Sequence, residues 1–454
     1  MAAFENLIFT LSNELWSKWV LIFLIGTGIV TLFATNGVQS HLGLALKRTF
    51  KSWFKKDEGA IEGAEGNISP VKSLMNALAS SIGVGNVVGV GTAIASGGPG
   101  AIFWMWMSAL LGMSLKYAEV VLSLKYREKD DEGIYRGGPM YVYKNGLNLK
   151  WAGNIFAVCM ILVSLVSLNM VQISSAASSL NETFNIPPIV TAIVATIIVG
   201  LVTMRGLRGL TQASQFSVTV MTGFFVIGGL LVLILNIIRI PAAMALIFKS
   251  AFTGQAAVGG FTGAAVAASI RFGVARGLLA NEAGCGTAPM AHSTASVKHP
   301  AEQGLLGMSE VFIVSFIVCT FTALVILVTG VWETGENGVV LVAKAFSKDF
   351  GFLGEAIVAI TVASFAIKVA FGGSWYGQTS VAFLFGTKGI MPYKIIALVL
   401  CFLGAMLGSD FLFALTDTAN GFAVIVNTIS VLLLTKVYRN ETKEYFNTEE
   451  SKVA

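Results

Sequence analysis

Residues 79–91 read Ala-Ser-Ser-Ile-Gly-Val-Gly-Asn-Val-Val-Gly-Val-Gly, and this stretch decides the fold. It lies within a long apolar segment, yet it holds glycines at 83, 85, 89 and 91, which free the backbone from a single helical pattern. Unwound backbone at membrane depth persists only where it lines a protein or water cavity. The stretch therefore predicts a broken membrane helix beside a binding site. The alternative is that these glycines only allow helices to pack closely.

The composition places the whole chain in a membrane. Of its 454 residues, 55% are hydrophobic and 12% are charged, about half the ~25% charged fraction of soluble domains. The mean hydropathy is +0.76. A spanning helix needs about 20 mostly apolar residues, and only helices satisfy the backbone within such segments. We predict an all-α membrane protein with about eleven transmembrane helices, at 19–34, 69–95, 99–124, 151–178, 187–204, 212–237, 255–292 (interrupted), 305–331, 352–382, 392–408 and 411–436.

The distribution of positive charge predicts the orientation. Most of the 30 Lys and Arg residues face the cytoplasm if the N-terminus lies outside and the C-terminus inside, as the positive-inside rule requires. The net charge of +5 therefore reflects membrane topology, and we expect no nucleic-acid partner. The predicted location is the cell membrane, in which the chain crosses the lipid bilayer several times.

Two stretches of the sequence resemble each other. Ala-Ser-Ser-Ile at 79–82 matches Ala-Ala-Ser-Ile at 267–270, and each is followed by Leu-Gly-Met-Ser, at 111–114 and 306–309. In the predicted topology the two copies begin on opposite sides of the membrane, which is typical of inverted repeats. We predict a five-plus-five inverted repeat with one extra N-terminal helix. Its parts are 1–68 (the extra helix and a cytoplasmic linker), 69–237 (first repeat), 255–436 (second repeat) and 437–454 (cytoplasmic tail).

Ionisable residues inside predicted spans are the other functional signal. Such residues are costly in hydrocarbon, so each is predicted to be functional or paired. They are Glu119, Arg271, Arg276, Glu282, Lys368 and Asp417. No hydrolase motif, nucleotide-binding loop or metal-ligand spacing accompanies them, so we predict neither an enzyme nor an ATP-driven pump. A channel is the remaining alternative, but paired breaks at matching repeat positions favour alternating access.

Gly97-Gly98-Pro99-Gly100-Ala101-Ile102-Phe103-Trp104-Met105-Trp106 closely resembles the signature of the alanine/glycine:cation symporter family, the sodium:alanine symporters. Further stretches resemble the same family: Gly83-x-Gly85-Asn86, Gly137-Gly138-Pro139-Met140-Tyr141, Val171-Gln172, Arg276-Gly277, Asn281-Glu282-Ala283-Gly284, and Asp417 with Asn420-Gly421. The resemblance implies a leucine-transporter-like fold and cation symport of small neutral amino acids, usually with sodium. It implies no cofactor, with the sodium ion as the coupling ion, and we expect the chain to function as a monomer.

The resemblance also implies a substrate site. The amino-acid carboxylate would meet the amides of 83–85, and a second break at 270–273 would lie opposite. The implied substrate-binding residues are Gly83, Val84, Gly85, Asn86, Gln172, Ser174, Phe272, Gly273, Val369 and Gly373. Several of them depart from the family pattern, which has Thr at 84, Asn at 174, Gln at 272 and Trp at 373. We expect a neutral, somewhat apolar and still small side chain.

A cation site is implied next to it. The fold would hold sodium with the carbonyls of Ala79, Ile82 and Phe365 and with two adjacent hydroxyls, at positions where this sequence has Lys368 and Val369. Two interpretations remain open. Sodium coupling is retained through other ligands such as Thr361 and Ser364, or the Lys368 ammonium replaces the sodium ion. In the second case transport would be sodium-independent or proton-coupled.

Overall fold

The computed structural model describes residues 2–54, 64–253, 262–406 and 410–448. The long apolar segments within these ranges form helices. Over these ranges eight helices are long and apolar enough to cross a membrane, or up to ten if each of two bent helix pairs is one span. This confirms the predicted all-α membrane class. The count of eleven spans and the inverted repeat stay predictions.

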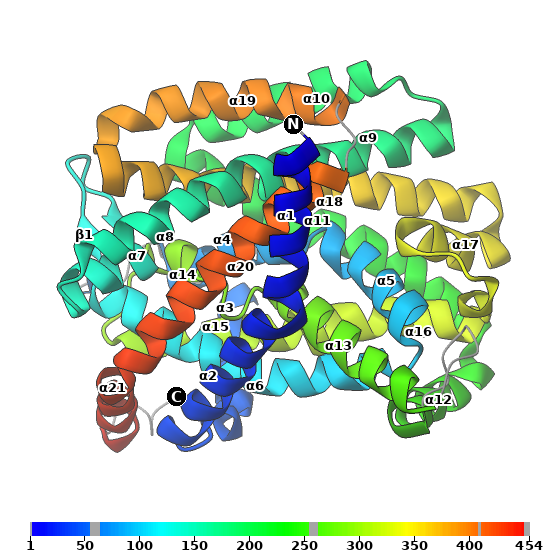
Figure 1. The fold of residues 1–454 in the computed structure, drawn as a ribbon, viewed down its shortest axis with the longest axis horizontal. Helices are drawn as coiled ribbons and strands as arrows, with labels where there is room; N and C mark the ends of the chain where they lie inside the picture. The colour runs from blue at the N-terminus through cyan, green and yellow to red at the C-terminus, as the bar shows by residue number, and fades with distance from the viewer. Residues whose placement is uncertain (1, 55–63, 254–261, 407–409, 449–454) are drawn as a thin grey trace.

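The helices follow one another with short connections (Figure 1). The first are α1 (Ala2–Glu14), α2 (Val20–Ala34), α3 (Leu42–Phe54), α4 (Pro70–Ser81), α5 (Val88–Gly97) and α6 (Ala101–Lys125). The next are α7 (Pro139–Tyr141), α8 (Lys150–Leu162), α9 (Val171–Phe184), α10 (Pro188–Met204), α11 (Gly206–Leu235) and α12 (Ile240–Thr253). The last are α13 (Thr262–Asn281), α14 (Ala288–His292), α15 (Pro300–Phe312), α16 (Thr320–Thr329), α17 (Gly338–Phe350), α18 (Phe352–Phe385), α19 (Ile390–Met406), α20 (Asp410–Leu433) and α21 (Thr435–Asn447).

Two long spans contain π-helical turns. The segment η5 (Val163–Met170) joins α8 to α9, and η7 (Ile313–Cys319) joins α15 to α16. Turns of this kind are rare and frequently mark functional sites. The only sheet in the described ranges is an antiparallel hairpin of β1 (Glu128–Lys129) and β2 (Tyr135–Arg136).

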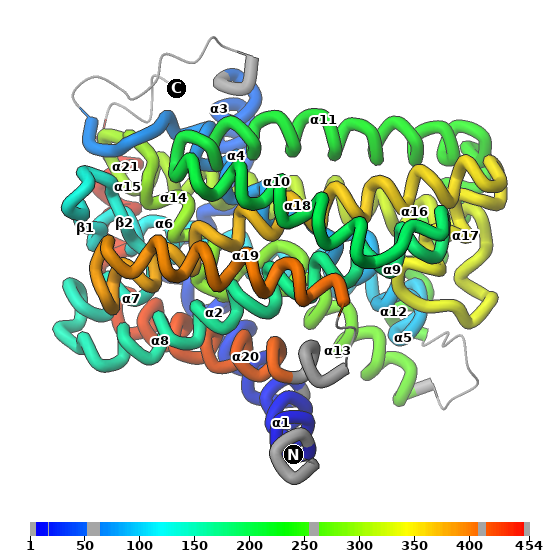
Figure 2. Tube along the Cα trace, turned by 90° about the horizontal axis from the view of Figure 1, so that it is seen from above, coloured from blue at the N-terminus to red at the C-terminus, as the bar shows by residue number. Residues whose placement is uncertain are grey.

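The chain connections lie at two opposite ends of the molecule. Figure 1 shows β1, α7 and α21 at one end and α12 and α17 at the other. Figure 2 shows α11 along one face, with α1 projecting from the face that carries α20. The segments predicted to be cytoplasmic, 125–150 and 437–454, thus belong to the same end as far as they are described.

The first helix break lies within the glycine-rich stretch, as predicted. Helix α4 ends at Ser81, and the chain resumes through η3 (Val84–Asn86) into α5 with its axis turned by 66°. Gly83 is extended, with φ −129° and ψ −163°. A Cβ atom on Gly83 would lie 2.5 Å from Cγ2 of Val369, so α18 approaches the broken backbone too closely for a larger residue.

The second break lies further along the chain than predicted. Helix α13 runs without interruption through 270–273, so the expectation of a break there was wrong. A Cβ atom on Gly273 would lie 2.3 Å from the carbonyl oxygen of Ala101, and this glycine therefore serves close packing of α13 on α6. The chain leaves the helix at Glu282, which has φ +53°, and passes Gly284 and Gly286 at φ +83° and +73° before α14. Glycine adopts this left-handed region readily.

Candidate functional site

A cavity of about 240 Å³ lies between the two helix breaks. Its walls come from α4, η3 and α5 around the first break, and from α13 and the segment before α14 around the second. Residues of η5, α9, α18 and α20 complete it. Its size is below the ~300–1,000 Å³ of pockets for drug-sized ligands, so it suits a small molecule.

The first break opens into this cavity. Gly83, Val84 and Gly85 line it, and a Cβ atom on Gly85 would have no atom within 4 Å. Their amides begin the helical segment formed by η3 and α5, where N–H groups lack intrahelical acceptors. Such a terminus carries partial positive charge and suits an anionic group. Val369 of α18 also lines the cavity, as the sequence predicted.

Gln172 presents an acceptor without a partner. It lines the cavity, its Nε2 donates to the carbonyl of Ser167 at 3.2 Å, and its buried Oε1 makes no hydrogen bond with any described residue. Ser174 does not line the cavity, whereas Ser175 does. The reason is helical periodicity, since a residue two positions after Gln172 points to the other side of α9 and a residue three positions after it returns to the same face.

Asn86 is buried but lies outside the cavity wall. Its Nδ2 donates to the carbonyl of Ser81 at 2.6 Å, and its Oδ1 accepts from Cys319 Sγ at 3.2 Å. The break frees the Ser81 carbonyl from its helical donor, and a buried carbonyl without a partner is costly. Asn86 therefore holds the break together, and its predicted role in substrate binding stays a prediction.

Phe272 and Gly273 are also absent from the cavity wall. Both lie in the unbroken part of α13, where Phe272 approaches Gly97 and Gly273 approaches Ala101. The prediction failed because it placed the second break about ten residues too early, roughly three helical turns. The residues of α13 and the second break that do line the cavity are Arg276, Leu279, Ala280, Glu282, Cys285 and Thr287.

Gly373, which the resemblance implies as a substrate-binding residue, does not line the cavity. A Cβ atom there would lie 2.4 Å from Cβ of Leu168, and its carbonyl accepts from Ser164 Oγ at 2.7 Å. Leu168 itself lines the cavity. A leucine from η5 thus packs against Gly373 and forms this part of the cavity wall. Sequence reasoning missed it because no local motif marks a residue that packs against a glycine far away in the chain.

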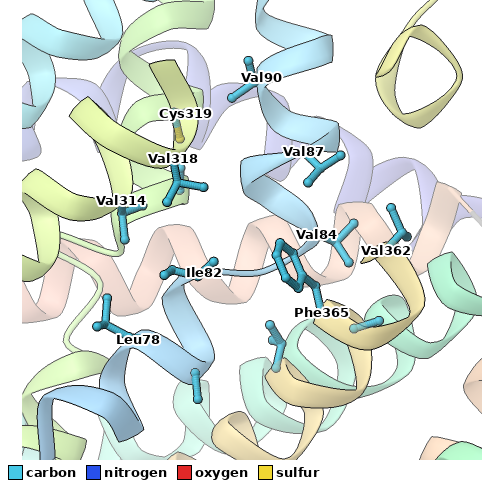
Figure 3. Packing of buried hydrophobic residues seen from close by; sticks show 14 of the residues in the cluster. Leu78, Ile82, Val84, Val87, Val90, Val314, Val318, Cys319, Val362 and Phe365 are labelled. Atoms are coloured by element: carbon cyan, nitrogen blue, oxygen red, sulfur yellow. The ribbon is translucent and has the colours of Figure 1, made fainter. Parts of the chain in front are cut away.

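The residues whose carbonyls are predicted to hold the cation have buried apolar side chains, and the carbonyl site itself stays a prediction. Ala79, Ile82 and Phe365 belong to one core cluster, and Figure 3 shows Ile82, Val84 and Phe365 gathered at the first break. Thr361 Oγ1 donates to the carbonyl of Ile357 at 2.7 Å. Ser364, the other hydroxyl suggested as a ligand, does not line the cavity between the breaks.

Lys368 is fully buried but does not bind the carbonyls predicted for it. Its Nζ has no hydrogen-bond partner among the described residues and lies 4.3 Å from the centre of the Phe365 ring. The prediction that this ammonium is held by the carbonyls of Ala79 and Ile82 was therefore wrong in this arrangement. The contact that Lys368 makes is with the face of an aromatic ring, which attracts a cation.

Three charged residues line the cavity: Arg276, Glu282 and Asp417. Glu282 accepts hydrogen bonds from Ser80 Oγ at 2.9 Å and Thr287 Oγ1 at 2.6 Å. Among the described residues, Glu282 and Arg276 form no ion pair with each other. Ser80 and Thr287 were not in the predicted site, although Ser80 lies within the stretch 79–91 and Thr287 lies three residues after the motif 281–284.

Comparison with known proteins places these features in a family. The profile of the sodium:alanine symporter family matches residues 1–454. A sodium/alanine symporter, AgcS, of Methanococcus maripaludis is 38% identical over 97% of this chain and 97% of its own length. An uncharacterized transporter of Haemophilus influenzae is 38% identical over 97% of this chain and 96% of that protein. A solved manganese transporter of Eremococcus coleocola shares the fold, with a TM-score of 0.56 over 87% of both chains at 14% identity.

Proposed function

This chain belongs to the sodium:alanine symporter family, and we propose that it imports small neutral amino acids of the alanine and glycine class by cation symport. It is a transporter and not an enzyme, like the proteins of its family. Sodium is the proposed coupling ion, and we propose that the chain works as a monomer in the cell membrane. The observation that carries the proposal is the small cavity between the two helix breaks.

The cavity offers partners for both ends of an amino-acid zwitterion. The amides of 83–85 at the start of η3 suit the carboxylate. The unpartnered Oε1 of Gln172 and the backbone carbonyls of the breaks can accept from the ammonium. Leu168, Val171 and Val369 supply apolar walls, which favour a small neutral side chain over a charged one.

Uptake by reconstituted protein tests the proposal. Proteoliposomes that contain the purified protein should accumulate radiolabelled alanine or glycine when an inward sodium gradient is imposed. Choline in place of sodium, at the same osmolarity and membrane potential, is the control. Absence of uptake for every small neutral amino acid, from protein that remains folded, would overturn the proposed substrate class.

The same proposal includes an inverted topology for the two repeats, 69–237 and 255–436, and an external N-terminus. It rests on the excess of Lys and Arg in segments such as 125–150 and on the arrangement of the connections at opposite ends. Cysteine at Glu182, an exposed position near the end of α9, should react with a membrane-impermeant thiol reagent in intact cells. Cysteine at Lys144 should react only after the cells are opened, and the reverse pattern would contradict the orientation.

A second candidate is a carrier that needs no sodium. It is favoured by Lys368, a buried ammonium on α18 at the position where the family pattern has a cation-binding hydroxyl. Here the lysine supplies the positive charge of the missing ion, and transport is sodium-independent or coupled to protons. Uptake that persists in choline and becomes sodium-dependent in Lys368→Thr would establish this candidate. Sodium-stimulated uptake by the unchanged protein would exclude it.

A further inference from the structure

Glu282 connects the two broken helices. Its Oε1 accepts from Ser80 Oγ, which lies in the last turn of α4 before the first break, and its Oε2 accepts from Thr287 Oγ1 at the end of the second break. All three residues line the cavity. Glu282 itself adopts the left-handed conformation, φ +53°, with 8% of its surface exposed. Four side-chain oxygens, two from the carboxylate and one from each hydroxyl, therefore lie together in the cavity wall between the two breaks.

The carboxylate of Glu282 has no ion-pair partner within the part of the chain that the structure describes. Lys116, a buried cation whose charge acts on the Glu282 carboxylate, pairs with Glu310 instead, at 3.6 Å from Nζ to Oε1. A second buried carboxylate, Glu119, accepts from the amide of Gly284 and from Asn427 Nδ2. Lys116 thus faces three carboxylates, and one ammonium cannot neutralise them all.

An ionised carboxylate in such a place requires a positive partner. Two hydrogen bonds from hydroxyls reduce the cost of burying the charge, but they do not cancel it. Glu119 has no opening to the cavity, whereas Glu282 does, so a mobile cation can reach Glu282 from the cavity. Hard cations prefer oxygen ligands, and a carboxylate with two hydroxyls provides them. The hydroxyls can rotate to present lone pairs to a metal ion, because each is both donor and acceptor.

We propose that Glu282, with the hydroxyls of Ser80 and Thr287, binds the monovalent cation that is cotransported with the amino acid. This inference rests on the proposed symport function, for which it names the cation site. Sodium would bind the carboxylate and both hydroxyl oxygens, whereas a proton would bind the carboxylate alone, and the resulting carboxyl would donate a hydrogen bond to one hydroxyl. The site joins the first break to the second through Glu282, Ser80 and Thr287, and Lys368 of α18 is not one of its ligands.

The location explains how the cation and the substrate are coupled. The cation would draw α4 and the second break together at the same cavity that holds the amino acid at 83–85. Because each ligand then favours the same arrangement of the two breaks, each increases the affinity for the other. The charged and titratable groups around Glu282 are Lys116 and Glu119 of α6, Glu310 of α15, Cys285, and Tyr376 of α18. Arg276 and Asp417 line the cavity itself, and His292 of α14 contacts Glu310.

Direct cation binding by the purified full-length protein tests the site. Titration calorimetry measures the binding of sodium to the protein in detergent. In a separate experiment without sodium, the uptake of protons by the protein is measured at several pH values. Glu282→Gln keeps the shape and removes the charge. It should weaken sodium binding about 30-fold or more, as loss of one partner of a buried charge pair does. Ser80→Ala and Thr287→Val keep the carboxylate and should each weaken it about fivefold.

Glu119→Gln is the matched control, because it removes a buried carboxylate beside the same lysine but outside the cavity. Sodium binding that is lost in Glu282→Gln and kept in Glu119→Gln supports a sodium site. Loss of a pH-dependent proton uptake in Glu282→Gln, with no sodium binding by the unchanged protein, supports a proton site. Unchanged sodium and proton binding in Glu282→Gln would overturn the inference.

Two further readouts separate this inference from the proposed function. If the unchanged protein binds or transports no small amino acid, the function fails, whatever Glu282 does. If it transports alanine and Glu282→Gln transports it with the same cation dependence, only the cation site fails. If Glu282→Gln does not fold, the two hydroxyl variants decide, since neither removes a charge.

Discussion

The ammonium of Lys116 lies 3.6 Å from Oε1 of Glu310, and both side chains are fully buried. Lys116 stands two residues after Leu-Gly-Met-Ser at 111–114, and Glu310 directly follows the same motif at 306–309. The pair therefore joins α6 to α15 between the two predicted repeats. The other oxygen of Glu310 lies 3.0 Å from Nε2 of His292, whose Nδ1 lies 2.7 Å from Gln303 Nε2.

Removing one partner of this ion pair should destabilise the protein more than removing both, because it leaves a single charge buried without a partner. Glu310→Leu leaves the Lys116 ammonium buried without its partner and should destabilise the protein by about 3–5 kcal/mol. The double variant Lys116→Met with Glu310→Leu removes both charges and should recover most of that loss. The thermal midpoint in detergent measures both. Additive effects of the two single changes would show that the residues do not interact.

Substitution of Gly85 should abolish substrate binding without unfolding the protein. A side chain on Gly85 meets no atom within 4 Å at Cβ, so leucine there extends into the cavity and fills it. Equilibrium binding of radiolabelled alanine to Gly85→Leu should fall below detection, while the thermal midpoint stays close to that of the unchanged protein. Alanine binding of normal affinity by the folded variant would place the substrate elsewhere.

Leu168 should limit the size of the substrate side chain. It lines the cavity and packs against Gly373, so Leu168→Ala should enlarge the apolar wall. Competition of alanine uptake by valine or leucine should strengthen about 10-fold or more, the effect expected of a few methylene groups. Leu162→Ala on the exposed side of the preceding helix is the control and should change nothing. Stronger competition by lysine or glutamate than by valine would contradict a neutral apolar site.

The first break could be predicted from sequence because its signal is local. Glycines at 83 and 85 stand within an apolar run, and few arrangements in a membrane tolerate that combination. The predicted position of the second break is wrong because the similarity of 267–270 to 79–82 does not mark the same structural position. Gly273 instead serves the contact with Ala101, and the residues that require positive φ are Gly284 and Gly286.

The sequence predicts a cavity-lining residue only where the position of that residue depends on its neighbours in the chain. Gln172 and the glycines of the first break line the cavity as expected. Leu168 and Ser80 do so because of partners more than 200 residues away, Gly373 and Glu282, and a single sequence does not display such contacts. Helical periodicity favours Ser175 over Ser174 as a lining residue, because Ser175 lies three positions after Gln172 and therefore on the same face of α9.

Replacement of Lys368 by methionine should stabilise the protein. The ammonium is fully buried, lacks a hydrogen-bond partner in the described residues, and has only the Phe365 ring within cation–π distance. Methionine keeps much of the shape without the charge. Replacement of buried charge by an apolar side chain of similar volume is often stabilising by about 1–4 kcal/mol, which the thermal midpoint in detergent detects.

Lys344→Met, at an exposed residue paired with Glu336, is the control and should change stability by less than about 0.5 kcal/mol. A lower midpoint for Lys368→Met would mean that the ammonium is bound by oxygen ligands after all. A higher midpoint together with altered cation dependence of uptake would mean that the charge is kept for transport and not for the fold.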